Sequence, residues 1–365
     1  MQAMAINEDK LNQFVEKTFG DLGATLSGAL VMLGDRLGIY KAMADGVTVT
    51  PAELARKTHL NERYLREWLL NQAAGGYVEY NKDSQRFRLS PEQAMVLADE
   101  HSPVFMQGGF QVCASAFLDA DKIEQGFRTG KGVDWGDHHP CLFEGTERFF
   151  RPGYEANLVQ KWIPALEGVE AKLKSGAMVA DIGCGYAAST LIMAKAYPNS
   201  QFIGFDTHAP SVDRAGALAA KAGVSKNCEF KTSRSTDFPP PAVRAGISGR
   251  TSGYDLVCCF DCLHDMGDPV GAARHIKTTL ARDGTWMIVE PFANDKVEEN
   301  LNPIGRAFAA ASTLVCVPHS LAHHGPALGA QAGETKLREV VMKGGFTRFR
   351  RAAQTPFYFI LEARI

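Results

Sequence analysis

The stretch "MVADIGCGYAAS", residues 178–189, decides the fold of this chain. It begins with the mainly apolar run "MVADI", continues into two glycines separated by one residue, and leads into "AASTLIMAKAYP", which has helical character and ends near a proline. A buried strand, a glycine turn and a helix in this order are typical of the first unit of an α/β domain. The glycines allow a ligand to lie against bare backbone at the N-terminus of the helix.

The residues after this stretch continue the same alternation. Further strands are predicted at "QFIGFD", "CEFKTS", "YDLVCCF" and "TWMIVEP", and helices at "SVDRAGALAAKAG" and "PVGAARHIKTTLARDG". Alternation of this kind predicts an α/β fold with a Rossmann-like, doubly wound parallel sheet that binds its ligand at the carboxyl ends of the strands. The chain ends in "GGFTRFRRAAQTPFYFILEARI", two strand-like runs with a short link, so we expect an antiparallel hairpin with a reversed last strand.

The residues from Ala24 to Asp99 have a different pattern, in which short helices precede a hairpin. Thr50-Pro51-Ala52-Glu53 predicts a helix start with a capping box, and Asn61 begins "NERYLREWLLNQAAGG", an amphipathic helix ended by glycines. The segment "YVEYNKDSQRFRLS" alternates around a polar turn and predicts two short strands. This order of elements predicts an N-terminal winged helix-turn-helix domain.

The charge of this domain does not favour DNA binding. Its nine basic residues are balanced by nine acidic ones, and the whole chain has a net charge of −2. The expected recognition helix places Glu62 and Glu67 beside Arg63 and Arg66, which weakens attraction to phosphate groups. We therefore expect dimerisation or a lid over a substrate in preference to DNA, and no membrane partner.

The chain is long enough for two domains and a connector. With 365 residues, 45% of them apolar, we expect a winged-helix domain at 1–100, a helical connector and lid at 101–172, and a catalytic domain at 173–365. The connector is rich in aromatic side chains, which suit either a roof over a substrate or packing between domains. These residues are Trp135, His138, His139, Phe149 and Phe150.

The cysteines and the apolar segments indicate the compartment. The first residues have no basic segment followed by an apolar one, and no apolar run reaches the length of about 18 residues that a membrane span needs. Eight cysteines in a chain of this length are typical of reduced, buried thiols, so we expect a cytoplasmic protein. Cys259 and Cys262 have no second pair at zinc-finger spacing, and the sequence predicts no metal site.

Two nucleotides fit the glycine turn. Gly183-x-Gly185-x-x-Ala188 satisfies a relaxed dinucleotide pattern, and Asp206, 21 residues after Gly185, is placed to accept hydrogen bonds from ribose hydroxyls. Asp181 favours a different cofactor, because a carboxylate before the glycines would repel a pyrophosphate and attract a cation. The sequence therefore predicts S-adenosylmethionine, with an NAD-dependent oxidoreductase as an alternative.

At this point the sequence resembles the class I S-adenosylmethionine-dependent methyltransferases, and within them a mycobacterial group with an N-terminal winged helix. The matching stretches are "WIPALEGVEAKL", "VADIGCG", "FIGFD", "FDCLHDMGDPVGAARH", "DGTWMIVEPF" and "GGFTRFRR". The resemblance implies a seven-stranded sheet with a reversed last strand. It also implies cofactor contacts from Asp181, Gly183, Gly185, Asp206, Phe260 and Asp261.

The order of domains also resembles small-molecule O-methyltransferases, whose winged-helix domain usually dimerises. In those enzymes a histidine after the fourth strand is the general base, and acidic residues orient it. The resemblance places His264 of "LHDM" at this position and matches Glu290, at the end of the fifth strand, to one of the acids. His264 can alternatively position a substrate, pack as a core residue or, as a minor interpretation, ligate a metal.

Two positions depart from the family pattern. The second orienting acid falls on Gln331, so Glu290 alone would orient His264. The acid expected to meet the adenine amino group falls near Ser233 and Arg234, which leaves Asp237 as a displaced candidate. The first departure bears on the base mechanism, because one orienting acid is missing.

The sequence thus predicts a homodimeric methyltransferase that moves a methyl group from S-adenosylmethionine to a small apolar or aromatic acceptor, with His264 as the general base. It does not identify the acceptor, or whether its nucleophile is oxygen, nitrogen or sulfur. The alternative is a winged-helix transcriptional regulator that binds the cofactor without turnover. We interpret His208 as a solvated loop residue, and we leave a surface or substrate role open for His319, His323 and His324.

Overall fold

The computed structural model describes residues 6–241 and 253–365. These residues form two compact units. The first contains residues up to Ala114 together with Glu144–Pro152, and the second contains Ser115–Phe143 and Gly153–Ile365. The expected connector, 101–172, is therefore not a body of its own, because its helices pack partly with each unit. Helices α6 (Gln107–Leu118) and α8 (Cys141–Asn157) contribute residues to both.

The first unit has the helix and hairpin order that the sequence predicts. Thr50 and Glu53 form the predicted capping box, and Asn61 caps the following helix by accepting from the backbone N–H groups of Arg63 and Tyr64. Its elements are α1 (Glu8–Arg36), α2 (Ile39–Met43), α3 (Pro51–Thr58), α4 (Glu62–Ala74), β1 (Glu79–Asn81), β2 (Arg86–Arg88) and α5 (Pro91–Leu97). β1 and β2 pair antiparallel as the wing.

The first helix is longer than the sequence pattern indicated. The prediction placed the first helical region after Ala24, whereas α1 begins at Glu8, where the Asn7 side chain accepts from the Lys10 N–H at 2.9 Å. It ends before Gly38, whose φ of +68° no other residue type adopts as easily. The pattern failed here because the apolar residues of the first turns lie on an exposed face.

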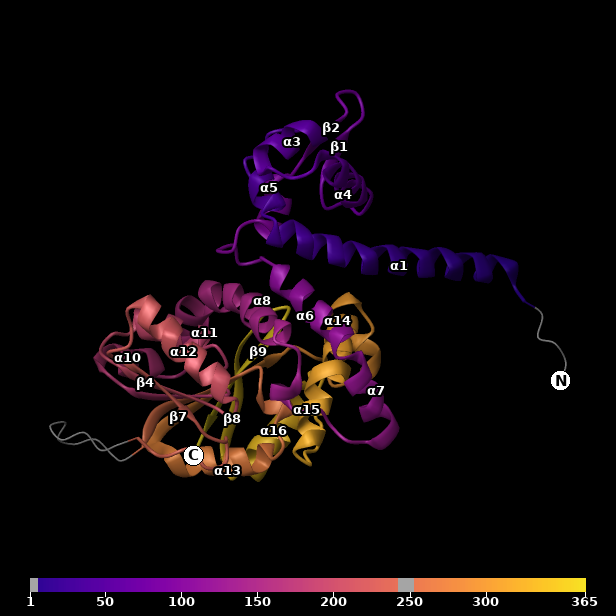
Figure 1. The fold of residues 1–365 in the computed structure, drawn as a ribbon. Helices are drawn as coiled ribbons and strands as arrows, with labels where there is room; N and C mark the ends of the chain where they lie inside the picture. The colour runs from indigo at the N-terminus through magenta and orange to yellow at the C-terminus, as the bar shows by residue number, and fades with distance from the viewer. Residues whose placement is uncertain (1–5, 242–252) are drawn as a thin grey trace. The chain divides into compact units, whose positions relative to one another are not determined.

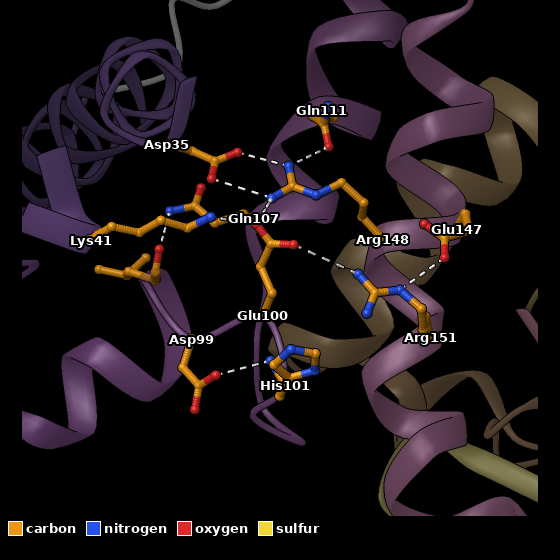
Figure 2. A network of polar contacts seen from close by, with 11 residues as sticks. Asp35, Lys41, Asp99, Glu100, His101, Gln107, Gln111, Glu147, Arg148 and Arg151 are labelled. Atoms are coloured by element: carbon orange, nitrogen blue, oxygen red, sulfur yellow. Dashed lines mark hydrogen bonds and ion pairs between the residues drawn. The ribbon is translucent and has the colours of Figure 1, made fainter. Parts of the chain in front are cut away.

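An ion-pair network holds residues 144–152 in this unit, as Figure 2 shows. The Arg148 guanidinium contacts Asp35 of α1 at 2.7 Å and the Gln111 side chain of α6 at 2.9 Å. It also lies over the Phe105 ring, 5.4 Å from the ring centre. Arg148 is largely buried, so these contacts replace the water that its charge would otherwise require.

The second unit contains the seven-stranded sheet that the sequence predicts, in the order β5-β4-β3-β6-β7-β9-β8. The strands from β5 to β7 are parallel, and β9 is antiparallel to both of its neighbours. The strands are β3 (Met178–Ile182), β4 (Gln201–Asp206), β5 (Cys228–Thr232), β6 (Tyr254–Phe260), β7 (Leu280–Pro291), β8 (Arg348–Gln354) and β9 (Tyr358–Arg364).

Helices flank both faces of this sheet, with α11 and α12 on one side and α13 and α16 on the other (Figure 1). Ala272, Ile276 and Leu337 of the second pair pack in one core with strand residues such as Val257 and Ile288. The helical elements are α7 (Ala120–Thr129), η1 (Trp135–Asp137), η2 (Leu158–Trp162), α9 (Ile163–Ala165), α10 (Val169–Ser175), α11 (Ala188–Ala196), α12 (Ala209–Ala222), η3 (Leu263–Asp265), α13 (Pro269–Thr279), η4 (Val297–Asn300), α14 (Pro303–Ala311), η5 (Ser312–Cys316), α15 (Val317–Ala322) and α16 (Gly333–Lys343).

One predicted helix boundary is wrong. The pattern extended the helix after Pro269 to Gly284, but α13 ends at Thr279 and β7 starts at Leu280. Leu280 pairs with Tyr254 of β6 and Thr285 pairs with Leu256, with a register shift that takes up "ARDG", so tertiary pairing overrides the predicted helix there. The strand order reverses between β3 and β6, and a ligand crevice is expected at their carboxyl ends.

Candidate active site

The glycine turn after β3 has the conformation that its sequence predicts. Gly183 and Gly185 have φ values of +70° and +50°, which side chains rarely tolerate. A Cβ atom on Gly183 would lie 2.9 Å from the Cys262 sulfur. The Gly183 and Cys184 N–H groups both donate to the Phe205 carbonyl of β4. The turn is thus fixed against the neighbouring strands before any ligand binds.

Asp206 organises this turn from the end of β4. One carboxylate oxygen accepts from the Gly185 N–H at 2.8 Å, and the other accepts from the His208 N–H at 2.8 Å. Burial raises the pKa of the carboxyl group, and these two N–H donors oppose that effect. Each oxygen keeps a second lone pair, so the predicted contact with ribose hydroxyls stays possible and stays a prediction.

Asp181 ends β3 as a buried carboxylate with one oxygen unsatisfied. Its Oδ2 accepts from the Ser189 hydroxyl at 2.7 Å and the Thr190 hydroxyl at 2.5 Å. Its Oδ1 is buried and has no hydrogen-bond partner in the described structure. Burial raises the pKa of Asp181 to about 6. A buried acceptor of this kind is unfavourable alone and becomes favourable when a cationic donor binds beside it.

Asp261 repeats this arrangement at the end of β6. Its φ is +52°, an uncommon conformation for an aspartate, and its Oδ2 accepts from the Tyr154 hydroxyl at 2.5 Å. Its Oδ1 is buried without a partner in the described structure, and burial raises the pKa of the carboxyl group to about 8. No sequence pattern indicated Tyr154, which is 107 residues from Asp261 and reaches it from α8.

His264 and Glu290 form the buried pair that the family resemblance implies. The His264 Nδ1 lies 2.5 Å from Glu290 Oε2, and the second oxygen of Glu290 accepts from the Leu263 N–H at 2.8 Å. Burial alone would lower the pKa of His264, but the Glu290 carboxylate outweighs it, so the pKa lies well above its ordinary value. The Cys316 thiol also lies against the imidazole, a neighbour that the sequence did not indicate.

The remaining predicted residues differ in their surroundings. Phe260 is buried and packs on Tyr154, with ring centres 5.3 Å apart. Asp237 is exposed, and its carboxylate caps a turn by accepting from the Ser233 hydroxyl and the Arg234 N–H. Gln331 donates to the Ala330 carbonyl. The structure therefore brings most of the predicted residues to the strand ends, while Asp237 lies in a solvent-exposed turn beyond β5.

Part of the aromatic connector lies beside the glycine turn. Trp135 packs on Phe143, which packs on the His208 ring at 4.8 Å between centres. His208 is therefore partly buried, and the interpretation of a solvated loop residue is wrong. His138 is buried against Asp119, whereas His139 is exposed. The second aromatic pair, Phe149 and Phe150, belongs to the first unit.

Two family models match separate parts of the chain. Residues 25–99 match the family described as "Rv2258c-like winged HTH domain". Residues 173–340 match the family described as "Methyltransferase domain". These bounds fall inside the winged-helix and catalytic domains that the sequence predicts.

Known proteins resemble the chain in sequence and in fold. The ubiquinone biosynthesis O-methyltransferase of Paraburkholderia phytofirmans is 29% identical over 140 residues, which cover 38% of this chain and 52% of that enzyme. The match spans about half the length of the curated relatives. The mitomycin 7-O-methyltransferase MmcR has 19% identity and a TM-score of 0.66, covering 98% of this chain and 100% of MmcR. Human N-acetylserotonin methyltransferase, solved in complex with SAM, has 14% identity and a TM-score of 0.67, and the match covers 100% of this chain and 99% of the human chain.

The fold, with its glycine turn after the first strand of the sheet, is similar to that of these solved methyltransferases. The chain contains this methyltransferase domain behind a winged helix-turn-helix domain, as the sequence predicted. Among the described residues, no helix has both the length and the apolar character that a membrane crossing requires.

Proposed function

We propose that this protein transfers a methyl group from S-adenosylmethionine to a hydroxyl group of a small molecule, with His264 as the general base. The observation that carries the proposal is the buried contact between His264 and Glu290 at the carboxyl end of the parallel strands. A hydroxyl nucleophile needs a base near neutral pH, and a carboxylate at Nδ1 fixes the ring so that Nε2, beside the Cys316 thiol, is the atom that would take the proton of the acceptor. Glu290 acts as the positioning residue.

The residues at the strand ends fit the cofactor. When bound, S-adenosylmethionine supplies an activated methyl group, so the protein needs alignment and a dry site more than electrophilic help. Asp181 and Asp261 each have a buried oxygen without a partner in the described structure, which suits cationic or hydroxyl donors of the cofactor. The left-handed turn at Gly183 and Gly185 leaves backbone bare where an adenosine would approach.

The raised pKa of His264 has a consequence for the reaction. In the unliganded protein the Glu290 carboxylate stabilises the charged form of the imidazole, which raises the pKa of His264. The base form grows as the pH rises through this pKa. We therefore expect methyl transfer to increase with pH in the neutral to alkaline range, and the proton taken from the acceptor to remain on the imidazole beside Glu290.

Two measurements test the proposal. Calorimetry of the full chain with S-adenosylmethionine, S-adenosylhomocysteine and NADH should give binding heat for the first two only. Incubation with methyl-labelled donor and fractionated cell metabolites should then label a small molecule. Asp206→Ala should weaken donor binding by about 1 to 3 kcal/mol, because the turn and the bound hydroxyls lose their acceptor. Absence of binding by a folded sample, or binding of NADH alone, would overturn the cofactor assignment.

The second candidate function, a transcriptional regulator, is disfavoured by charge pairing in the winged helix. On α4, Arg63 pairs with Glu67 at 2.5 Å and Arg66 pairs with Glu62 at 2.8 Å. The wing arginines pair in the same way, Arg86 with Glu53 and Arg88 with Glu79. A gel shift on promoter fragments at physiological salt should show no sequence-selective binding, and a selective, salt-resistant shift would favour the regulator.

We also propose that the protein is a homodimer that pairs through α1. Leu11, Val15, Phe19, Leu22 and Leu26 are all about half exposed or more. At about 100° per residue these positions fall within an arc of roughly 80°, so they form one apolar stripe along the helix. Such a stripe suits a second copy of the same helix. Light scattering should give a dimer mass, and Leu22→Glu with Leu26→Glu should give a monomer that still binds the donor.

A cytoplasmic location is part of the same proposal. All eight cysteines are free thiols, including the buried Cys184, Cys258 and Cys259. Reduced thiols of this kind are usual in a reducing compartment. Fractionation of source cells should recover the protein without detergent and with its thiols reactive to alkylation after unfolding.

A further inference from the structure

A cluster of one aspartate and two histidines lies in the second unit and contains none of the residues proposed above for the reaction. The Asp134 Oδ1 is 3.1 Å from His319 Nδ1 and 3.0 Å from His323 Nε2. One ligand atom from each of the three residues lies within 4.8 Å of the other two. In the part of the chain that the structure describes, no other group of histidine, cysteine or acidic residues meets this geometry.

Local structure brings these residues together. His319 and His323 are four residues apart at the end of α15, so they lie on one face, with ring centres 4.9 Å apart. Asp134 approaches from the segment before η1, where the Val133 N–H donates to the Pro318 carbonyl at 3.0 Å. Gly132 has no room for a side chain, because a Cβ atom there would overlap the backbone of Pro318 and Ala322. The aspartate is therefore held against the helix.

The hydrogen bonds at His319 leave an unfavourable contact that a cation would relieve. The Trp135 N–H points both to Asp134 Oδ1 at 2.7 Å and to His319 Nδ1 at 3.1 Å. When Nδ1 accepts this N–H, it cannot donate to Asp134, so two acceptor atoms share one donor and repel each other across 3.1 Å. A metal ion between them removes this repulsion and leaves the Trp135 N–H with Asp134.

The spacing and the chemistry fit a divalent transition metal. In a tetrahedral zinc site, metal–ligand bonds of about 2.0 to 2.1 Å place the ligand atoms about 3.3 Å apart. The distances from Asp134 Oδ1 to the two histidine nitrogens are close to this value. Two imidazoles and a carboxylate are the ligands of borderline ions such as zinc, and the spacing His-x₃-His is common in zinc sites. The Asp206 and Asp265 carboxyls lie near enough to interact with His319, which makes the surroundings negative.

We propose that Asp134, His319 and His323 bind a zinc-class divalent cation, with water completing the coordination. The ion fastens the segment that carries Trp135 to α15. Trp135 packs on Phe143, and Phe143 packs on His208. The ion would therefore restrict the motion of these three rings, which lie beside the glycine turn. Asp134 and His319 are 185 residues apart, so the sequence analysis, which expected no metal site, could not group them.

The test is calorimetric titration of Zn²⁺ into the untagged full chain, freed of metal and kept in a buffer without chelators. We expect one ion per chain, binding at least 10-fold weaker in Asp134→Asn and in His323→Ala, and unchanged binding in the control His324→Asn. All three changed side chains are at least partly exposed, so folding should persist, and circular dichroism checks this. Co²⁺ should give the visible absorption of a four-coordinate site in the wild type and in the control only.

Three outcomes would overturn the proposal. Wild type without measurable zinc binding would mean that the cluster is a hydrogen-bonded clamp. Equal binding by wild type and Asp134→Asn would place any bound ion elsewhere. Loss of binding in His324→Asn alone would assign the ion to a different histidine. None of these results depends on methyl transfer, so they leave the proposed reaction to its own test.

Discussion

Charged side chains have different surroundings in the winged-helix domain and at the strand ends of the methyltransferase domain. In the winged helix, arginines pair with glutamates one helical turn away, on the neighbouring wing strand or on α3. At the strand ends, Asp181 and Glu290 are buried and Asp261 has a buried Oδ1; among the described residues, the cation that pairs with one of these acids is His264. Unsatisfied charge is unfavourable for folding, so its concentration at one edge of the sheet marks where ligands bind.

The largest effect should come from removing the histidine of the buried pair. His264→Gln should lower kcat/KM for the labelled acceptor by about 10² to 10⁴-fold, the usual contribution of a general base. The affinity for S-adenosylhomocysteine should not change. The control is His101→Gln, an exposed histidine of the winged-helix unit (Figure 2). Equal turnover by both variants would show that the acceptor needs no base, as for a thiol or amine, and would remove O-methyl transfer by this route.

Glu290→Gln should weaken the fold and shift the pH profile. Breaking one side of a buried ion pair costs about 3 kcal/mol. The raised pKa of His264 sets how this stabilisation depends on pH. The His264–Glu290 pair stabilises the fold fully below the unfolded pKa of about 6.5, and this stabilisation is lost as the pH rises through the folded pKa. Urea unfolding at several pH values measures the difference from wild type, which should shrink toward alkaline pH.

The same variant reports on positioning. Without the carboxylate, the pKa of His264 falls, so the rise of kcat/KM with pH should move to lower pH, an effect that simple destabilisation would not cause. A profile that stays in place would mean that Glu290 does not act on His264 during the reaction. Glu334→Gln, a change in an ion pair on α16, is the matched control.

Asp181→Asn should make the unliganded protein more stable. Because the folded pKa of about 6 is above the ordinary value, the ionised carboxylate costs up to about 3 kcal/mol at pH 7.5, and this cost disappears as the pH falls from 6 toward 4. Urea unfolding at pH 7.5 should show a gain of about 1 to 3 kcal/mol, together with weaker donor binding. The exposed Asp213→Asn on α12 should change neither quantity. A loss of stability in Asp181→Asn would mean that the carboxylate already has a partner.

The sequence predicted what depends on neighbours along the chain. The alternation of strands and helices, the final hairpin, the capping box at Thr50 and the glycine turn at Gly183 all follow from local pattern and backbone chemistry. Contacts between distant segments were not predictable, such as Tyr154 with Asp261, 107 residues apart, and Cys316 against His264. The start of α1 at Glu8 was missed because an exposed apolar stripe has no core contact to define it.

The smallest effect should come from the winged-helix pairs. Glu62 and Arg66 are about half exposed, so solvent screens their attraction, and a double-mutant cycle with Glu62→Gln and Arg66→Gln should give a coupling of about 0.3 to 0.5 kcal/mol. Thermal unfolding at low and high salt measures the coupling and its screening. A coupling above about 1.5 kcal/mol would contradict the contrast between the two regions, because the winged-helix charges would then contribute as much to folding as a buried pair. A weak, salt-sensitive coupling would instead mean that these pairs contribute little to folding. Their main effect would then be to neutralise arginines that a DNA-binding domain would leave free for phosphate groups.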